Sequence, residues 1–228
     1  MEKKSIVLLS GGLDSATCAA ISQNLGFDTH AISFDYGQRH KDELNFAKDI
    51  AKMLGISNHI TSECNLTIFG NSALTAEIDV PKNIPQTEIG KSIPITYVPA
   101  RNTIFLSLAL AWAETIQCYD LFIGVNSIDY SGYPDCRPEF IESYENMANI
   151  AMSITKDSKN RLKIHTPLID MDKKEIILKG MSLGIDYAKT VTCYDYNKDG
   201  ACGVCEACIL RLNGFKQAGL KDPGKYRN

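Results

Sequence analysis

A strand-like run near the start of the chain ends in glycines, hydroxyl groups and one acid. Residues 5–9, SIVLL, are apolar, and SGGLDS follows at 10–15. Two adjacent glycines before a helix let backbone N–H groups approach an anion, and the helix N-terminus adds partial positive charge. The hydroxyls of Ser10, Ser15 and Thr17 can donate to phosphate oxygens. These residues therefore predict a phosphate site.

The acid in this stretch narrows the chemistry further. Asp14 would be repelled by phosphate unless a cation lies beside it, so it indicates Mg²⁺. The stretch lacks the lysine of GxxxxGK[ST] and the third glycine of GxGxxG, which excludes a Walker A site and a dinucleotide fingerprint. The two glycines alone would also fit a plain turn between a strand and a helix.

Four of the eight cysteines lie close together near the C-terminus, at Cys193, Cys202, Cys205 and Cys208. The spacing C-x8-C-x2-C-x2-C can place four thiolates around one ion. An iron–sulfur cluster or catalytic thiols are alternatives, but the C-x3-C-P continuation of the bacterial cluster motif is absent. We predict a zinc ion that is structural, because four protein ligands leave no open position.

Alternating strands and helices must position these groups. Strands are predicted at 5–9, 29–36, 57–62, 120–125 and 161–168, and helices at 13–26, 41–55, 101–116, 139–154, 172–184 and 206–219. This alternation predicts an α/β fold with a doubly wound, mostly parallel sheet and flanking helices. Residues 63–95 lack a period, so they predict either a binding loop or a disordered segment.

We divide the chain into an α/β domain at 1–185 and a cysteine-containing zinc-binding segment at 186–228. The loop at 126–140 follows the strand predicted at 120–125. In parallel sheets, ligands bind beyond the carboxyl ends of the strands, so this loop and the glycine stretch are expected at the same edge.

Composition limits the class of partner. The net charge is −3, and the 24 lysines and arginines are scattered, which argues against direct nucleic-acid binding and favours small-molecule substrates. The apolar run IVLL is too short for a secretory signal, and no apolar stretch approaches the roughly 20 residues of a membrane span. We expect a cytoplasmic protein that is not held in a membrane.

These motifs together resemble a known family. SGGLDS after the first strand matches the SGGxDS loop of the PP-loop ATP pyrophosphatase superfamily, which has the adenine nucleotide alpha hydrolase-like fold. With YGQRH at 36–40, YVPARN at 97–102, SGYPDCR at 131–137 and the four cysteines, the chain resembles the 7-cyano-7-deazaguanine synthases of queuosine biosynthesis. Ala100 departs from this pattern, because the family more often has glycine there.

The resemblance implies an ATP-dependent carbon–nitrogen ligase that converts 7-carboxy-7-deazaguanine and ammonia to 7-cyano-7-deazaguanine (preQ0) through adenylated intermediates. It also implies one zinc ion and a homodimer. Two alternatives remain open at this point: a PP-loop enzyme that thiolates or otherwise modifies tRNA, and a zinc-stabilised nucleotide-binding module without catalysis. The lack of a basic block argues against the first.

The resemblance also assigns residues. It implies zinc binding by the four cysteines, and ATP binding by Leu8, Leu9, Ser10, Gly11, Gly12, Leu13, Asp14, Ser15, Ala16, Thr17 and Cys18. The candidate catalytic residues are Asp14, Arg101 and His40. A guanidinium pairs bidentately with a phosphate or a carboxylate, which suits Arg101, although a surface salt bridge is the alternative.

The SGYPDCR loop is the candidate site for the deazaguanine. We expect Asp129 or Asp135 to accept hydrogen bonds from the guanine-like edge, Tyr133 to stack on the ring, and Arg137 to assist binding. Helix capping ahead of Pro138 is the alternative for these residues.

Overall fold

Five parallel strands form one sheet in the computed structural model, which describes residues 3–39, 42–126, 132–156 and 160–227. The strands are β1 (Lys4–Leu8), β2 (Asp28–Asp35), β3 (His59–Glu63), β4 (Asp120–Phe122) and β5 (Lys163–His165). The helices are α1 (Leu13–Asn24), α2 (Asp42–Met53), α3 (Arg101–Ile116), α4 (Pro138–Ala151), α5 (Lys173–Ser182) and α6 (Glu206–Gln217). Short 3₁₀ helices lie at Thr67–Phe69, Gln86–Glu88, Pro134–Cys136, Ser153–Thr155 and Tyr187–Lys189.

The strand order is β3-β2-β1-β4-β5, and every pair of neighbours is parallel. The chain therefore moves outward from β1 through β2 to β3, and then returns to the other side of β1 for β4 and β5. The direction of winding reverses between β1 and β4, the position at which open parallel sheets bind ligands. This arrangement confirms the predicted doubly wound parallel sheet.

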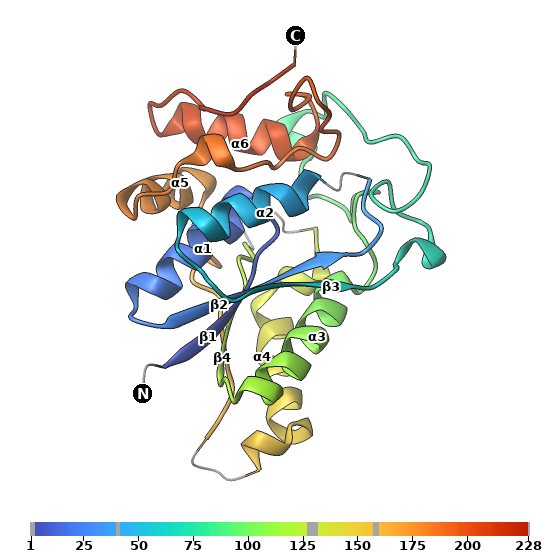
Figure 1. Ribbon diagram of the computed structural model, residues 1–228. Coiled ribbons are helices and arrows are strands. Elements are labelled where there is room, and N and C mark those ends of the chain that lie inside the picture. Colours follow the sequence, from blue (N-terminus) through green and yellow to red (C-terminus); the bar gives the residue numbers. More distant parts are fainter. Residues whose placement is uncertain (1–2, 40–41, 127–131, 157–159, 228) are drawn as a thin grey trace.

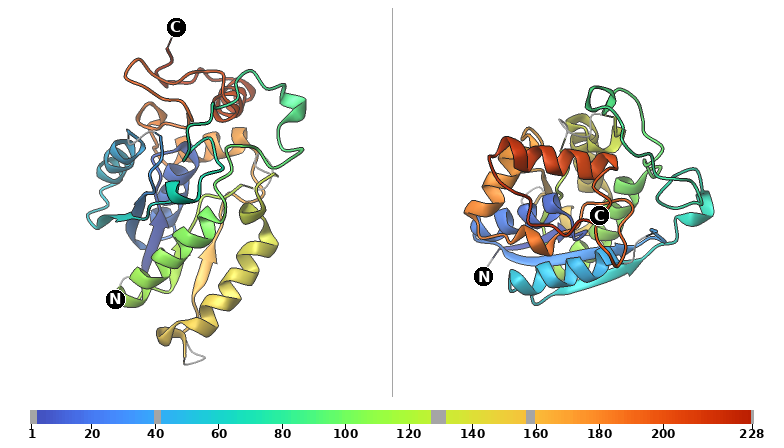
Figure 2. Two further views of the ribbon diagram at one scale, coloured as in Figure 1. Left: turned by 90° about the vertical axis from the view of Figure 1, so that its right-hand side faces the viewer. Right: turned by 90° about the horizontal axis from the view of Figure 1, so that it is seen from above.

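Helices cover both faces of the sheet (Figures 1 and 2). Side chains alternate between the faces along β1. Ile6 and Leu8 belong to the buried cluster that includes α3 and α4, whereas Val7 belongs to the cluster that includes α1, α2, α5 and α6. Because both faces are buried, β1 ends in consecutive buried apolar residues, Ile6, Val7 and Leu8, as in other doubly covered parallel sheets.

The C-terminal segment packs on one of these two faces. Tyr187 and Phe215 are buried in the same cluster as α1 and the sheet, with their rings in edge-to-face contact at 5.7 Å. The boundary at residue 185 stays a prediction, although the two sides of it share this apolar cluster. No helix within the described ranges has the length and apolar character needed to cross a membrane.

The long connection between β3 and α3 extends beyond the sheet and returns beside the C-terminal segment (Figure 2). The backbone N–H of Asn83 donates to the carbonyl of Val204 at 2.8 Å, and Lys82 forms an antiparallel bridge with Cys205. Ala73 and Val80 pack into the cluster around the four cysteines. These contacts argue against a disordered segment, and a binding role for this loop stays a prediction.

Ala100 has a left-handed backbone, with φ 55° and ψ 21°, at the residue before α3. This conformation costs a residue with a Cβ atom about 1–2 kcal/mol, and glycine adopts it without that cost. Greater freedom of glycine in the unfolded chain offsets roughly 0.5–1 kcal/mol of the gain. We expect Ala100→Gly to raise the free energy of unfolding by about 0.5–1 kcal/mol, measured by urea titration.

Ala111→Gly is the matched control for this prediction, because Ala111 is an exposed residue inside the same helix. Glycine in a helix interior should lower the free energy of unfolding by about 1 kcal/mol. An Ala100→Gly protein no more stable than the original would contradict the strain at Ala100.

Candidate functional site

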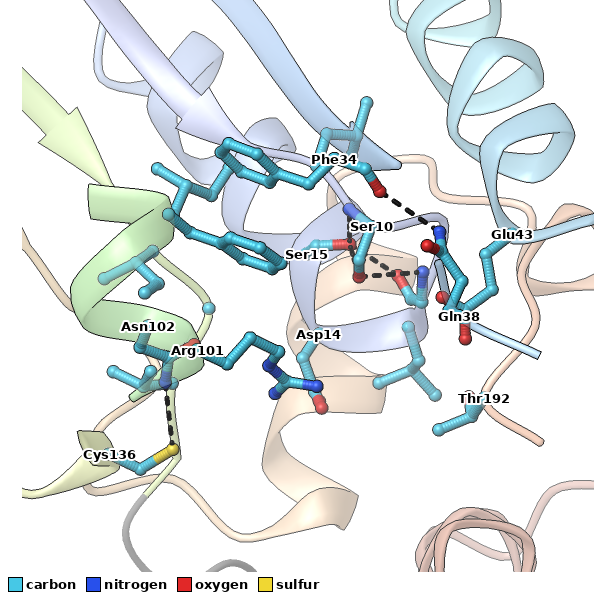
Figure 3. A pocket seen from close by; sticks show the side chains of 18 of the residues that line it. Ser10, Asp14, Ser15, Phe34, Gln38, Glu43, Arg101, Asn102, Cys136 and Thr192 are labelled. Atoms are coloured by element: carbon cyan, nitrogen blue, oxygen red, sulfur yellow. Dashed lines mark hydrogen bonds between the residues drawn. The ribbon is translucent and has the colours of Figure 1, made fainter. Parts of the chain in front are cut away.

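A cavity of about 210 Å³ opens at the point where the winding of the sheet reverses. Its wall combines the end of β1 and the following loop, the residues after β2 and β4, the start of α3, and residues 191, 192 and 194. In Figure 3, Asp14, Glu43 and Arg101 extend into it from α1, α2 and α3. The cavity therefore contains side chains from both halves of the sheet. It lies at the carboxyl ends of the strands, where the sequence predicted the ligand site.

The glycine stretch forms a tight turn between β1 and α1. Gly11 has φ 84°, and a Cβ atom there would lie 2.4 Å from the carbonyl oxygen of Glu43. A side chain at this position would both strain the backbone and collide with α2. The Ser15 hydroxyl lies 3.0 Å from that of Ser10 and 3.1 Å from the carbonyl of Gly12. The turn is thus fixed by packing and by its own hydrogen bonds, with the N-terminus of α1 facing the cavity.

The predicted ATP-binding residues divide into two groups. The cavity wall includes Leu8, Leu9, Ser10, Gly12, Leu13, Asp14 and Ser15. The remaining four are Gly11, Ala16, Thr17 and Cys18, and they pack away from it. The Thr17 hydroxyl donates to the carbonyl of Leu13 at 2.9 Å, and burial raises the pKa of the Cys18 thiol. ATP binding by these residues stays a prediction.

Asp14 has a cationic partner within the chain. The ammonium of Lys173 donates to both carboxylate oxygens of Asp14, at 2.7 and 2.9 Å. The Lys173 side chain is 4% exposed and the Asp14 side chain 16%, so water screens this pair weakly. The sequence argument placed Mg²⁺ beside Asp14, and the structure places Lys173 there.

Lys173 could not be identified from the sequence. It lies at the first position of α5, where Asp172 and Glu175 form a capping box with two hydrogen bonds of 2.8 Å. The capping residues alone would predict the start of a surface helix. Nothing in the sequence distinguishes Lys173 from the exposed Lys174 beside it.

Arg101 lines the cavity at the first position of α3. Burial lowers the pKa of its guanidinium, but the acidic groups of Tyr36, Tyr133 and Asp135 outweigh burial and raise it. Arg101 therefore keeps its positive charge. Arg101 lies on the wall of a cavity that also receives the N-terminus of α1, which suits anionic ligands. Lys173 lies outside the lining residues and reaches this wall through Asp14.

The residues predicted to bind the deazaguanine occupy different positions. The ring of Tyr133 lines the cavity, and its hydroxyl lies 3.0 Å from that of Thr96. The Asp135 carboxylate accepts the backbone N–H of Asn102 at 3.0 Å and is not part of the wall. Arg137 is exposed and precedes α4.

Asp135 therefore caps the start of α3, rather than the helix after Pro138 that the alternative named. The side-chain amide of Asn102 donates back to the Asp135 carbonyl at 3.0 Å, which ties the SGYPDCR loop to α3. His40 and Asp129, the other predicted site residues, lie outside the described residues. Their roles, like those of Tyr133 and Arg137, stay predictions.

The four predicted metal ligands converge. The sulfur atoms of Cys193, Cys202, Cys205 and Cys208 all lie within 4.8 Å of one another. Four sulfurs bound to one zinc ion at about 2.3 Å would be about 3.8 Å apart, close to the 4.0 Å between Cys202 and Cys208. Backbone N–H groups of Cys202 and Cys205 donate to ligand sulfurs at 3.2 and 3.3 Å, which favours thiolates. The cluster fits a metal ion.

The metal site and the cavity share one stretch of chain. Thr192 and Tyr194 line the cavity on either side of Cys193. The backbone N–H of Val191 donates to the carbonyl of Gly11 at 3.0 Å. A metal ion that fixes Cys193 would therefore also fix one wall of the cavity and its contact with the glycine stretch.

The sequence matches the model of a known protein family. The family model described as "Queuosine biosynthesis protein QueC" matches residues 4–219. The chain belongs to this family. The matched residues include both the cavity and the cysteine cluster.

Two relatives illustrate the similarity of the QueC chain to named proteins. A 7-cyano-7-deazaguanine synthase of Citrifermentans bemidjiense is 58% identical over 228 residues, covering 100% of this chain and 99% of that protein. One from Desulfatibacillum aliphaticivorans is 55% identical over 226 residues, covering 99% and 97%. The names of these relatives indicate an enzyme.

A solved structure supports the fold of the QueC chain. It is described as a predicted subunit of tRNA methyltransferase from Methanocaldococcus jannaschii. The two share 18% identity with a TM-score of 0.52, over 99% of this chain and 92% of the other. At this identity the likeness concerns the fold alone.

We expect Lys173→Met to lower the free energy of unfolding by about 3 kcal/mol, because the Asp14 carboxylate would remain largely buried without its ammonium. Urea titration measures this change. Asp14→Asn combined with Lys173→Met should cost less than the sum of the single changes, because the neutral amide needs no counter-charge. Lys174→Met is the control, with an expected change within about 0.5 kcal/mol. A Lys173→Met protein as stable as this control would contradict the ion pair.

Proposed function

We propose that this chain converts 7-carboxy-7-deazaguanine, ammonia and ATP into 7-cyano-7-deazaguanine, as an ATP-dependent carbon–nitrogen ligase of queuosine biosynthesis. The main support is the match of the QueC family model to residues 4–219, which include the whole cavity. The glycine stretch at the reversal of the sheet gives this cavity an anion site of the kind that a nucleotide requires.

The chemistry explains why ATP is consumed. A carboxylate is a poor electrophile, so its oxygen first attacks the α-phosphorus of ATP and pyrophosphate leaves. Ammonia then attacks the carbonyl carbon, AMP leaves, and an amide forms. Adenylation of the amide oxygen by a second ATP creates the leaving group that departs when the nitrile forms. Both adenylations need the same positions for nucleotide and ring, so one cavity serves both.

Arg101, Asp14 and the neighbouring Lys173 would each have a role in this scheme. The backbone of residues 10–15 and the N-terminus of α1 would hold the phosphates, with Mg²⁺ bound to the nucleotide. Arg101 would pair with a phosphate or with the substrate carboxylate, because its guanidinium remains charged. Lys173 would hold the Asp14 carboxylate in position beside the phosphate site. Pre-organised positive charge of this kind stabilises the departing pyrophosphate.

The aromatic wall would hold the flat ring. Phe34 and Phe105 line the cavity and are stacked on each other, with centroids 4.0 Å apart and planes at 8°. Tyr133 would contact the deazaguanine directly, and Asp129 and Arg137 are proposed partners for its polar edge. Asp135 would act through α3, because its carboxylate accepts the backbone N–H of Asn102, and Asn102 also lines the cavity.

We also propose that the four cysteines bind zinc and that the protein is a cytoplasmic homodimer with no direct nucleic-acid partner. The scattered distribution of its basic residues supports the last of these. Four thiolates complete a tetrahedron, so the zinc would stabilise the fold and would not activate a substrate.

We expect inductively coupled plasma mass spectrometry of the purified protein to find one zinc ion per chain. Cys205→Ser should lower this content and the melting temperature, because Cys205 is buried in the cluster. It should also weaken ATP binding, measured by calorimetry, because Thr192 and Tyr194 on the cavity wall flank Cys193. Cys64→Ser, at a partly exposed cysteine outside the cluster, is the control. Purified protein with iron in place of zinc would contradict the assignment.

Mass spectrometry of 7-carboxy-7-deazaguanine incubated with protein, ATP, Mg²⁺ and ammonia tests the proposed reaction. The expected products are the nitrile, AMP and pyrophosphate, with the amide as an intermediate at early times. Reactions without ammonia should release pyrophosphate but form no amide. ATP binding without any pyrophosphate release would contradict an enzyme and fit a nucleotide-binding module. A mass shift in tRNA with a sulfur donor, and no nitrile, would fit a thiolating enzyme.

A further inference from the structure

The proposed reaction releases protons, and few groups on the cavity wall can accept them. Each Asp14 oxygen already accepts a hydrogen bond from the Lys173 ammonium, so its carboxylate is engaged. Burial raises the pKa of the Tyr36 and Tyr133 hydroxyls, and that of the Cys136 thiol to about 12. These groups remain protonated near neutral pH. Among the described residues of the wall, Glu43 is the remaining carboxylate.

The position of Glu43 is fixed by its backbone. Glu43 is the second residue of α2, and its carbonyl oxygen packs so closely on Gly11 that a Cβ atom there would lie at 2.4 Å. The first turn of α2 is therefore held against the turn at residues 10–15, the proposed phosphate site, which we call the phosphate turn. From α2 the half-buried side chain extends into the cavity, beside Gln38 and Thr192 (Figure 3).

The electrostatic surroundings of Glu43 suit proton exchange. Burial raises the pKa of its carboxyl to about 7, and the Arg101 guanidinium opposes this shift only in part. Within the described part of the chain, no group donates a hydrogen bond to the carboxylate. A general base is most effective when its pKa lies near the working pH. Glu43 combines that property with a place on the cavity wall.

We propose that the Glu43 carboxylate is the base that takes up the protons released as ammonia becomes the amide and as the amide becomes the nitrile. This role rests on the function proposed above. It adds a catalytic residue that the sequence argument did not name. Glu43 lies three residues after His40, a candidate catalytic residue predicted from the sequence.

The proton balance follows from the two stages. In the first, the ammonia nitrogen bonds to the adenylated carbonyl carbon, one proton passes to a Glu43 carboxylate oxygen, and AMP leaves with the electron pair of the C–O bond. In the second, the amide oxygen displaces pyrophosphate from another ATP. The two remaining N–H protons then pass to Glu43 one at a time, with release to water between them. Cleavage of the C–O bond gives the nitrile and AMP.

Glu43→Gln tests this role, because the amide keeps the shape of the side chain and cannot accept these protons. Nitrile formation should fall about 10²-fold or more. Exchange of labelled pyrophosphate into ATP, in the presence of 7-carboxy-7-deazaguanine and without ammonia, should continue near the wild-type rate. Adenylation of the carboxylate releases no proton from nitrogen, so a defect confined to the later steps separates the base from a residue that shapes the ATP site.

The pH profile supplies a second readout. At a fixed concentration of un-ionised ammonia, the wild-type rate of nitrile formation should rise as pH increases through about 7, because the base is the deprotonated form of Glu43. Glu43→Gln should lose this rise, and Glu43→Asp should keep it at a lower rate. Asp49→Asn is the control, since it removes one negative charge from an exposed position of the same helix and should change neither the rate nor its profile.

Urea titrations of the wild type and Glu43→Gln at several pH values check that the variant folds and that Glu43 titrates in the native protein. Folding raises the pKa of Glu43 from its usual 4.5, so the charged side chain destabilises the native state. In urea titrations, the wild type should therefore lose stability relative to Glu43→Gln as pH rises from about 4.5 to 7. A constant difference across this range would show that Glu43 does not titrate there and would overturn the proposal.

Three further outcomes are informative. Nitrile formation by Glu43→Gln at the wild-type rate would overturn the role of Glu43 and leave the proposed function intact. Loss of the pH-dependent rise in His40→Gln, with its retention in Glu43→Gln, would also overturn it and assign the base to His40. Absence of nitrile with the wild-type protein would overturn the proposed function together with this role.

Discussion

The contact between Gly11 and the first turn of α2 is the constraint on which the site depends. At Gly11 the backbone must be left-handed, and the carbonyl of Glu43 occupies the space of a side chain. The Gly11 carbonyl also accepts the N–H of Val191. One residue without a Cβ atom therefore holds the phosphate turn, the helix after β2 and the segment that leads to Cys193 in a single arrangement.

The sequence was sufficient for the fold because its signals are local. Apolar runs and helical periodicity located the strands and helices, and α3 begins and ends at the residues expected, Arg101 and Ile116. Parallel pairing followed from the alternation of strands with helices. The cysteine spacing brought four sulfurs together because three of them fall within seven residues, 202–208.

The pairing of charged residues at the site could not be predicted from local sequence signals. Lys173 is 159 residues from Asp14, and no short-range pattern connects them. Glu43 resembles any acidic residue in the first turn of a helix until its backbone is seen against Gly11. Either Asp129 or Asp135 was expected to contact the substrate. The Asp135 carboxylate instead accepts the backbone N–H of Asn102, a contact that depends on how two distant segments pack.

The residues that hold the phosphate turn lie far from it in the sequence. Residues 10–15 are synthesised well before Lys173 and Val191, which hold Asp14 and Gly11. A nascent chain of 160 residues would contain the nucleotide motif and four strands of the sheet, but neither of these partners. At that length the turn would lack both the ion pair that holds Asp14 and the hydrogen bond that Gly11 accepts. The geometry of residues 10–15 therefore depends on segments that are translated long after them.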